Sequence, residues 1–137
     1  MTIRQLVEGV TVSGPLSDEE LTTLKNNNVK TLINVRPDAE EVGQKTHPEW
    51  QQQAQELGLA YHFLPVTSGQ YSLDQVQQFV AILQQAEQPT HMFCRTGTRA
   101  IHLWLLAQVE LGADVIELQH LADQHNVPLA DFVEKLD

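Results

Sequence analysis

The residues whose types and spacing could do chemistry lie in the segment CRTGTR, from Cys94 to Arg99. Cys94 is the one cysteine of the chain, and it follows an apolar run that is typical of a strand. Gly97 would let the backbone turn sharply, and the small side chains of Thr96 and Thr98 would leave the inside of the turn open. Backbone N–H groups above a helix N-terminus bind anions. The segment therefore predicts an anion-binding loop with a sulfur at its base.

Cys94 is predicted to be a nucleophile. Unpaired cysteines are often simply buried in a core, but the glycine, the small hydroxyl residues and the arginine at fixed offsets favour chemistry here. Backbone donors, the positive end of a helix dipole and two guanidinium groups would each favour the thiolate over the thiol. The planar fork of Arg99 could clamp two oxygens of a tetrahedral anion. Arg95 is expected either to contact that anion or to project into solvent.

Strand patterns and helix signals alternate along the chain on either side of this loop. Strands are predicted at residues 9–14, 30–35, 60–66 and 91–94. Capping residues predict the starts of three helices, at Ser17, Thr46 and Ser72. A helix from about Arg99 to Leu111 is apolar nearly all round and should be central, and shorter helices are expected beyond Gly112 and beyond the break at residues 126–128.

This alternation predicts one α/β domain over residues 1–137, with a mainly parallel sheet of four to five strands and helices on both faces. In such sheets the loops that follow the carboxyl ends of the strands gather at one edge and form the site. The loops at residues 36–45, 67–71 and 94–99 should therefore face one crevice.

The first of these loops carries the best candidate for a general acid, Asp38. An aspartate after a proline is also a common turn former. Asp74, in the first turn of a predicted helix, would more commonly interact with the helix dipole. Arg36 is expected either to add positive charge to the crevice or to pair with Glu40 or Glu41.

The composition is typical of an ordinary globular domain, with 137 residues of which 42% are hydrophobic and 19% charged. A formal net charge of −10 argues against nucleic acid and anionic membranes as partners. A single cysteine, the absence of a signal-peptide core and the lack of an apolar run long enough to span a bilayer favour a cytoplasmic location. The six histidines lack metal-binding spacings, so neither a metal nor another cofactor is expected.

The segment CRTGTRA resembles the signature loop of cysteine-dependent phosphatases and also the active loop of rhodanese-type sulfurtransferases. Together with GVTVSG, SDEEL, TLINVRPDAEE and LPV, residues 9–136 resemble the bacterial family of phosphatase-like domains of beta-lactamase-hydrolase-like proteins, a relative of the dual-specificity phosphatases. The resemblance implies a phosphatase-type α/β fold and a cysteinyl-phosphate intermediate. Cys94 would attack phosphorus, while Arg99 and the loop amides stabilise the equatorial oxygens and an acid protonates the leaving alcohol.

The sequence departs from the phosphatase pattern in three places. Tyrosine-phosphatase loops have five residues between the cysteine and the arginine, whereas four separate Cys94 from Arg99, as in the sulfurtransferases. Phe93 replaces the histidine that directly precedes the nucleophile in many phosphatases. After the third strand, where dual-specificity phosphatases carry an acidic aspartate, the chain has Thr67 and Ser68.

The sequence thus supports three hypotheses. The first is a cysteine-dependent phosphatase acting on a phosphorylated protein or a small-molecule phosphate, with Arg95, Thr96, Gly97, Thr98 and Arg36 contacting the substrate. The second is a sulfurtransferase that passes sulfane sulfur from a donor through a Cys94 persulfide, and the third is a weakly active anion-binding regulatory domain. The physiological substrate and the oligomeric state are not indicated.

Overall fold

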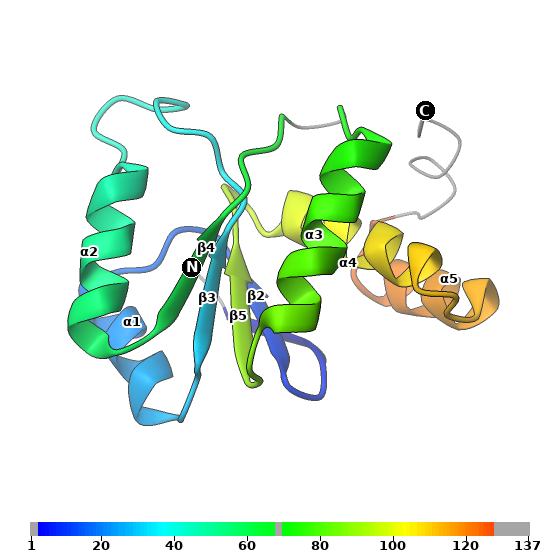
Figure 1. Ribbon diagram of the computed structural model, residues 1–137, viewed down its shortest axis with the longest axis horizontal. Coiled ribbons are helices and arrows are strands. Elements are labelled where there is room, and N and C mark those ends of the chain that lie inside the picture. The colour runs from blue at the N-terminus through cyan, green and yellow to red at the C-terminus, as the bar shows by residue number, and fades with distance from the viewer. Residues whose placement is uncertain (1–2, 68–69, 128–137) are drawn as a thin grey trace.

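The computed structural model describes residues 3–67 and 70–127, which form a twisted five-stranded sheet between two layers of helices (Figure 1). The strands are β1 (Arg4–Val7), β2 (Val10–Ser13), β3 (Thr31–Asn34), β4 (Ala60–Phe63) and β5 (Thr90–Phe93). Their order in the sheet is β1-β2-β5-β3-β4, and every neighbouring pair is parallel except β1 with β2. The expected α/β fold with a mainly parallel sheet is confirmed.

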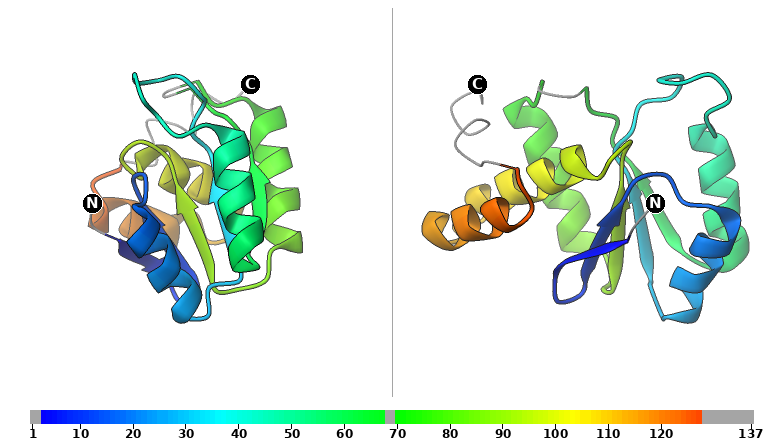
Figure 2. Two further views of the ribbon diagram at one scale, coloured as in Figure 1. Left: turned by 90° about the vertical axis from the view of Figure 1, so that its left-hand side faces the viewer. Right: turned by 180° about the vertical axis from the view of Figure 1, so that it is seen from behind.

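The helices lie on both faces of the sheet, as predicted (Figures 1 and 2). They are α1 (Asp18–Asn26), α2 (His47–Leu57), α3 (Leu73–Gln85), α4 (Thr98–Glu110) and α5 (Val115–Gln124). Successive residues of a strand point to opposite faces, so Phe93 joins the core cluster beneath α1 and α2, while Met92 joins the larger cluster beneath α3, α4 and α5.

Three helices begin at the capping residues predicted from the sequence. Ser17, Thr46 and Ser72 each form a capping box at the start of α1, α2 and α3. Gly58 ends α2 in the left-handed conformation, with φ of 74°. Helix α4 is buried on nearly all sides and contacts both α3 and α5, which explains its apolar sequence.

Two parts of the structure differ from the sequence prediction or extend it. Strand β1 was not predicted, because four residues at the edge of a sheet leave too short a pattern to recognise. Strand β4 ends at Phe63, earlier than the predicted stretch to residue 66. The helix expected after residues 126–128 lies outside the described residues.

The register of the sheet brings the loops that follow the strands to one level. Phe93 of β5 pairs with Ser13 of β2 on one side and with Asn34 of β3 on the other, and Asn34 pairs with Phe63 of β4. All four parallel strands therefore end in the same row of the sheet. The segments that begin at residues 14, 35, 64 and 94 start side by side, at the upper edge in Figure 1.

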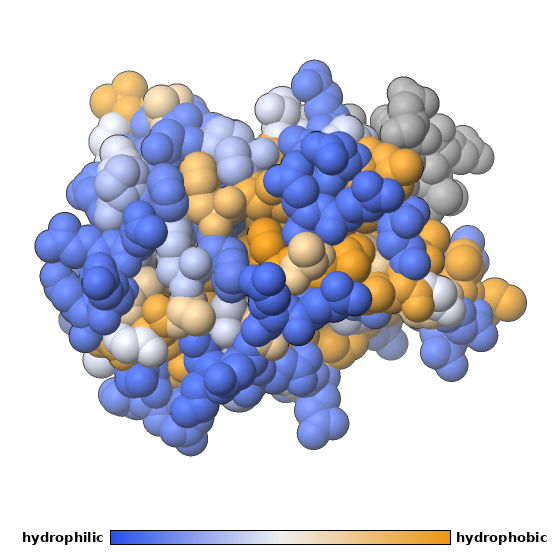
Figure 3. Space-filling view, in the orientation of Figure 1, coloured by the Kyte–Doolittle hydropathy of each residue, from blue (hydrophilic) through white to orange (hydrophobic). Residues whose placement is uncertain are grey.

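The surface is hydrophilic over α2, while hydrophobic residues gather at the turn between α4 and α5 (Figure 3). Leu111, Val115 and Ile116 are exposed there. Among the described residues, no helix has both the length and the apolar character that crossing a membrane requires.

Candidate active site

The loop between β5 and α4 turns at Gly97, which has φ of +92°. A Cβ atom at this position would lie 3.1 Å from Arg4 Nη2 and 3.4 Å from Val12 Cγ2. Both the left-handed backbone and the close contacts favour glycine. The glycine predicted to make the turn therefore has a steric as well as a conformational reason to be there.

Helix α4 begins without a side-chain cap, unlike the other helices in the described part of the chain. The backbone N–H groups of Arg95, Thr96, Arg99 and Ala100 have no hydrogen-bond acceptor among residues 3–67 and 70–127. The first turn of α4 carries no acidic residue either. Because the positive end of a helix dipole and unpaired N–H groups attract anions, this helix start is suited to anion binding.

Cys94 lies at the base of the loop and has no exposed area. Its sulfur accepts a hydrogen bond from the backbone N–H of Gly97 at 3.1 Å. Its own backbone N–H donates to the carbonyl of Ser13 at 3.4 Å. The sulfur is thus packed against the core cluster on one side and contacts a loop amide on the other.

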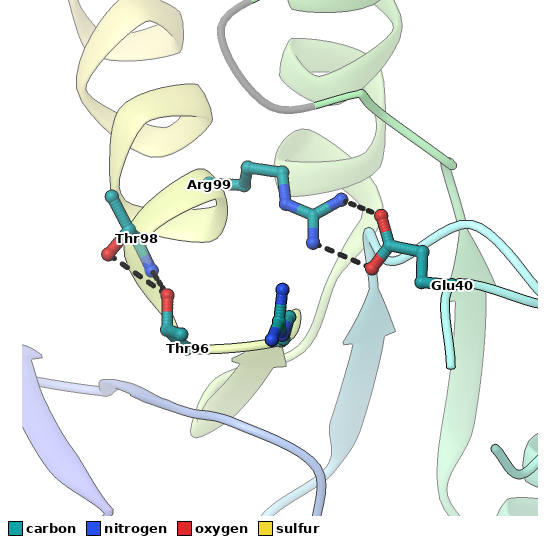
Figure 4. A pocket seen from close by; sticks show the side chains of 5 residues that line it. Glu40, Thr96, Thr98 and Arg99 are labelled. Atoms are coloured by element: carbon teal, nitrogen blue, oxygen red, sulfur yellow. Dashed lines mark hydrogen bonds and ion pairs between the residues drawn. The ribbon is translucent and has the colours of Figure 1, made fainter. Parts of the chain in front are cut away.

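Arg99 is held from both flanking loops. Its Nη1 donates to Glu40 Oε2 at 2.7 Å and to the carbonyl of Val66 at 2.8 Å, and its Nη2 donates to Glu40 Oε1 at 2.8 Å. A guanidinium has five N–H donors, so Nε–H and one Nη2–H remain without an acceptor among the described residues. Glu40 approaches from the side away from Thr96 and Thr98 (Figure 4), which leaves this free edge available to an anion.

The pairing between Arg99 and Glu40 shifts the pKa of both groups. Hydrogen bonds from Arg99, and to a lesser extent from Arg36, hold the pKa of the Glu40 carboxyl below its ordinary value against the opposing effect of burial. The hydrogen bond to Glu40 raises the pKa of Arg99. Both side chains are therefore charged near neutral pH, and the pair fixes the orientation of the guanidinium.

Arg36 pairs with both glutamates, which is one of the two roles expected for it. Its Nε donates to Glu40 Oε1 at 2.9 Å, and its Nη2 lies 3.1 Å from Glu41 Oε1. The same oxygen of Glu41 lies 3.0 Å from Nε of Arg95. Three guanidinium groups and two carboxylates thus form one network beside the cysteine loop.

A pocket of about 390 Å³ opens at this network. Its lining includes four of the predicted site residues, Arg95, Thr96, Thr98 and Arg99, and one carboxylate, that of Glu40. Arg99 bonds to Glu40 of the loop after β3 and to Val66 of the segment after β4, so these two segments meet the cysteine loop here. Thr67 and Tyr71, which were expected to face the same crevice, do not line the pocket, and Ser68 lies outside the described residues. Cys94 and Arg36 are buried and are not among the residues that line this pocket.

Asp38 is not brought into this pocket. Its Oδ1 accepts the backbone N–H of His47 at 2.8 Å, at the first residue of α2, and its side chain is exposed. Asp74 does not line the pocket either, and its Oδ2 accepts a hydrogen bond from Gln78 at 2.9 Å along α3. Within the described residues, no three His, Cys, Asp or Glu side chains are grouped to hold a metal ion.

Two features of the site could not be predicted from the sequence. The first is the contact between Glu40 and Arg99. Glu40 was expected only as a partner of Arg36, because no pattern connects it with Arg99, which is 59 residues away.

The second feature is the hydrogen bonding of His91, a buried residue of β5. His91 bonds to Thr11 Oγ1 at 2.7 Å and to Ser13 Oγ at 2.8 Å. Ser13 Oγ donates to the carbonyl of Gly14, so His91 Nε2 is the donor to Ser13 and Nδ1 accepts from Thr11. Burial lowers the pKa of His91 to about 4.

A sequence profile of the family described as beta-lactamase hydrolase-like protein, phosphatase-like domain, matches residues 2–111. The beta-lactamase hydrolase-like protein of Xylella fastidiosa strain 9a5c is 31% identical over 138 residues, covering 100% of this chain and 32% of that protein. The chain thus spans about a third of the length of this relative.

Solved structures share the fold. A candidate phosphatase from Neisseria meningitidis Z2491 is 32% identical with a TM-score of 0.82, over 98% of this chain and 96% of that one. The core catalytic domain of the PP-IP phosphatase Siw14 from S. cerevisiae, solved with citrate, has a TM-score of 0.73 at 15% identity, over 98% of this chain and 85% of that one. At that identity the second likeness shows the fold alone.

Proposed function

The chain belongs to the family of phosphatase-like domains of beta-lactamase hydrolase-like proteins, and we propose that it hydrolyses phosphate monoesters with Cys94 as the nucleophile. One observation carries the proposal. The sulfur accepts the Gly97 N–H at 3.1 Å at the uncapped start of α4, and Arg99 is fixed in the first turn of that helix with one edge of its guanidinium free.

The substrate phosphate would bind to donors that have no acceptor among the described residues. The free N–H groups of Arg99 take two equatorial oxygens in a bidentate contact. The amides of Arg95 and Thr96, together with the positive end of α4, take the remaining charge. Thr96 and Thr98 line the same pocket, and their hydroxyls would add hydrogen bonds to the phosphate.

The reaction would proceed in two displacements. The Cys94 thiolate forms a bond to phosphorus while the bond from phosphorus to the ester oxygen breaks, and that oxygen receives a proton as the alcohol leaves. A water molecule then attacks phosphorus and gives a proton to the carboxylate that protonated the alcohol, while the bond to sulfur breaks, so that inorganic phosphate is released and the thiolate and the acid are regenerated. Because water resolves the intermediate, a single cysteine is sufficient and no second thiol is needed.

Reaction at the sulfur requires that the loop makes room. Cys94 has no exposed area, and a nucleophile must approach phosphorus to within about 3–3.5 Å before bond formation. Arg95 and Thr96 follow Cys94 directly and are exposed. Movement of these two residues on phosphate binding would bring the sulfur into contact with the pocket.

Asp38 is proposed as the acid for the leaving oxygen, and it can serve only after its carboxylate leaves the amide of His47. Glu40 lines the pocket, but hydrogen bonds from Arg99 lower its pKa, so Glu40 is deprotonated near neutral pH. Glu40 is therefore suited to holding Arg99 in place rather than to donating a proton.

The nucleophile is tested with 4-nitrophenyl phosphate and the variant Cys94→Ser. The substitution should lower kcat by about 10³-fold or more, because the hydroxyl of serine is a far weaker nucleophile near neutral pH. Stabilisation by inorganic phosphate in thermal unfolding should persist, because the phosphate donors remain. Hydrolysis at the wild-type rate would contradict the proposal.

The acid is tested with Asp38→Asn and the matched control Asp74→Asn, since both aspartates are exposed and lie near a helix start. If Asp38 donates the proton, Asp38→Asn should lower kcat on an alkyl phosphate by about 10²–10⁴-fold. The effect on 4-nitrophenyl phosphate should be much smaller, because its leaving group needs little protonation. Equal rates for the two variants would assign the acid elsewhere.

The four-residue spacing between Cys94 and Arg99 favours one second candidate, transfer of sulfane sulfur through a Cys94 persulfide. The same protein is therefore incubated with thiosulfate and cyanide. Thiocyanate formation that is lost in Cys94→Ser would support sulfur transfer. Phosphate release without thiocyanate formation would support the phosphatase.

A further inference from the structure

The side chain of Glu41 lies between two guanidinium groups, those of Arg36 and Arg95, and Arg95 lines the pocket that holds Arg99. Its Oε1 is 3.0 Å from Nε of Arg95 and 3.1 Å from Nη2 of Arg36. Arg36 is itself buried, and its backbone N–H is fixed by Asn34 Oδ1 at 2.9 Å. The loop thus places a carboxylate of its own at a position where one buried and one exposed arginine converge.

Glu41 can leave this position easily, whereas Glu40 cannot. The side chains of Glu41 and Arg95 are 53% and 63% exposed, and water solvates both of them once they separate. The buried Arg36, which also contacts Glu41, keeps its bond to Glu40 when Glu41 leaves. Glu40 bridges two arginines whose side chains are only 6% and 7% exposed, and its departure would leave the buried Arg99 without its carboxylate partner. An incoming anion would therefore displace Glu41 and leave Glu40 in place.

The Glu41 position adjoins the reacting centre. Arg95 directly follows Cys94 in the chain, and it lines the same pocket as Arg99. The volume of about 390 Å³ falls within the range of small-molecule sites and exceeds what one phosphate group needs. A substrate held by Arg99 thus has room for a leaving group that reaches Arg95.

We propose that Arg95 and Arg36 form a second anion subsite, which Glu41 occupies when no ligand is bound. The preferred substrate is a phosphate monoester whose leaving group carries a second anionic group, either carboxylate or phosphate. The inference rests on the proposed phosphatase function, because it assumes that the ester phosphate binds at the cysteine loop. Arg95 then determines specificity, and Glu41 competes with the second anion.

The subsite is tested with 3-carboxyphenyl phosphate and 3-carbamoylphenyl phosphate, which have nearly the same size and differ by one charge. The wild-type protein should show a kcat/KM about 2-fold to 5-fold higher for the carboxylate, the range expected for an exposed charge pair. Arg95→Gln should reduce this ratio to about one. Glu41→Gln should increase it, because the competing carboxylate is removed.

Overall charge is controlled with two variants at exposed positions that are not part of the site. Glu117→Gln changes the net charge as Glu41→Gln does, and Lys30→Gln changes it as Arg95→Gln does. Both controls should keep the wild-type ratio. An unchanged ratio in Arg95→Gln, or changes of equal size in the controls, would overturn the subsite.

A binding measurement separates failure of the subsite from failure of the phosphatase proposal. Pyrophosphate carries two anionic groups, so it should raise the thermal unfolding temperature more than phosphate at equal concentration, and Arg95→Gln should remove the difference. This readout needs no turnover. If neither aryl phosphate is hydrolysed, the phosphatase proposal fails while the pyrophosphate result still decides the subsite.

Two sources could supply such a substrate, a small polyanionic ester or an acidic segment beside a phosphorylated tyrosine. Two phosphotyrosine peptides that differ by one neighbouring glutamate or glutamine separate them. A preference for the glutamate peptide that Arg95→Gln abolishes assigns the subsite to acidic peptides. A charge preference confined to the small esters assigns it to small molecules.

Discussion

Glu40 and Glu41 are neighbours in one loop, both are carboxylates, and both pair with arginines, yet their surroundings differ. Glu40 has a side chain 25% exposed and binds the buried Arg36 and Arg99 through both oxygens. Glu41 is half exposed, meets Arg95 at the surface, and shares the buried Arg36 with Glu40. An ion pair whose partners are buried is part of the architecture, because separating the partners leaves unsolvated charge. A pair whose partners are exposed is exchangeable.

The different surroundings of Glu40 and Glu41 indicate different roles for Arg99 and Arg95. Arg99 has three of its donors occupied by Glu40 and Val66 and so cannot rotate freely, which keeps the remaining donors aimed in one direction. Arg95 has one surface partner and can change it. A site that must hold a phosphate rigidly and accept varied leaving groups would use one arginine of each kind.

The comparison is tested most strongly with Glu40→Gln and Glu41→Gln. Glu40→Gln should lower the free energy of unfolding by about 1.5–3 kcal/mol, because Arg99 and Arg36 lose a charged hydrogen-bond partner. It should also lower kcat/KM on 4-nitrophenyl phosphate by about 10²-fold, because Arg99 is no longer fixed. Glu41→Gln should change the free energy of unfolding by less than about 0.5 kcal/mol. Urea unfolding and steady-state kinetics measure these effects.

A positioning role for Glu40 is separated from a merely structural role by phosphate binding. If Glu40 orients Arg99, Glu40→Gln should weaken protection by inorganic phosphate in thermal unfolding, and Glu40→Asp should restore part of it. A loss of stability with unchanged phosphate protection would show that Glu40 supports the fold alone. Equal effects of Glu40→Gln and Glu41→Gln on both readouts would remove the distinction between the two glutamates.

At low pH, Glu40 should contribute less to the free energy of unfolding. The pKa of Glu40 is lower in the folded protein than its ordinary value of 4.5, so its stabilising effect is complete above that value and is lost as pH falls through the folded pKa. The difference in unfolding free energy between the wild type and Glu40→Gln should therefore shrink below about pH 4.5. Urea unfolding of both proteins at a series of pH values measures it.

His91 also makes the free energy of unfolding fall as the pH falls, but its contribution cancels when the wild type is compared with Glu40→Gln. Burial lowers the pKa of His91 to about 4, so the folded state loses stability as pH falls below the unfolded value of 6.5. Both proteins keep His91, and its effect cancels in the difference. A difference that stays constant from pH 7 to pH 3 would contradict the buried pairing of Glu40.

The parts of the site that could be predicted from the sequence are those determined by neighbours in the chain. The turn at Gly97, the capping boxes and the pairing of Arg36 with Glu40 depend on residues at most four positions apart. The contact between Arg99 and Glu40 joins two loops through the sheet register, and no local pattern encodes it. Asp38 was expected to face the crevice, but the amide at the start of α2 competes for its carboxylate and holds it.

The smallest expected effect is the coupling between Glu41 and Arg95, measured by a double-mutant cycle of Glu41→Gln and Arg95→Gln. Because both side chains are exposed, the coupling free energy should lie between about 0.2 and 1 kcal/mol at low salt. It should approach zero in 1 M NaCl, where the Debye length is about 3 Å. The corresponding cycle of Glu40→Gln with Arg99→Gln should give a larger coupling that salt reduces far less, because those charges are shielded from ions by burial. A Glu41–Arg95 coupling that persists at high salt would mean that Glu41 is as firmly held as Glu40, and a second substrate anion could then not displace it.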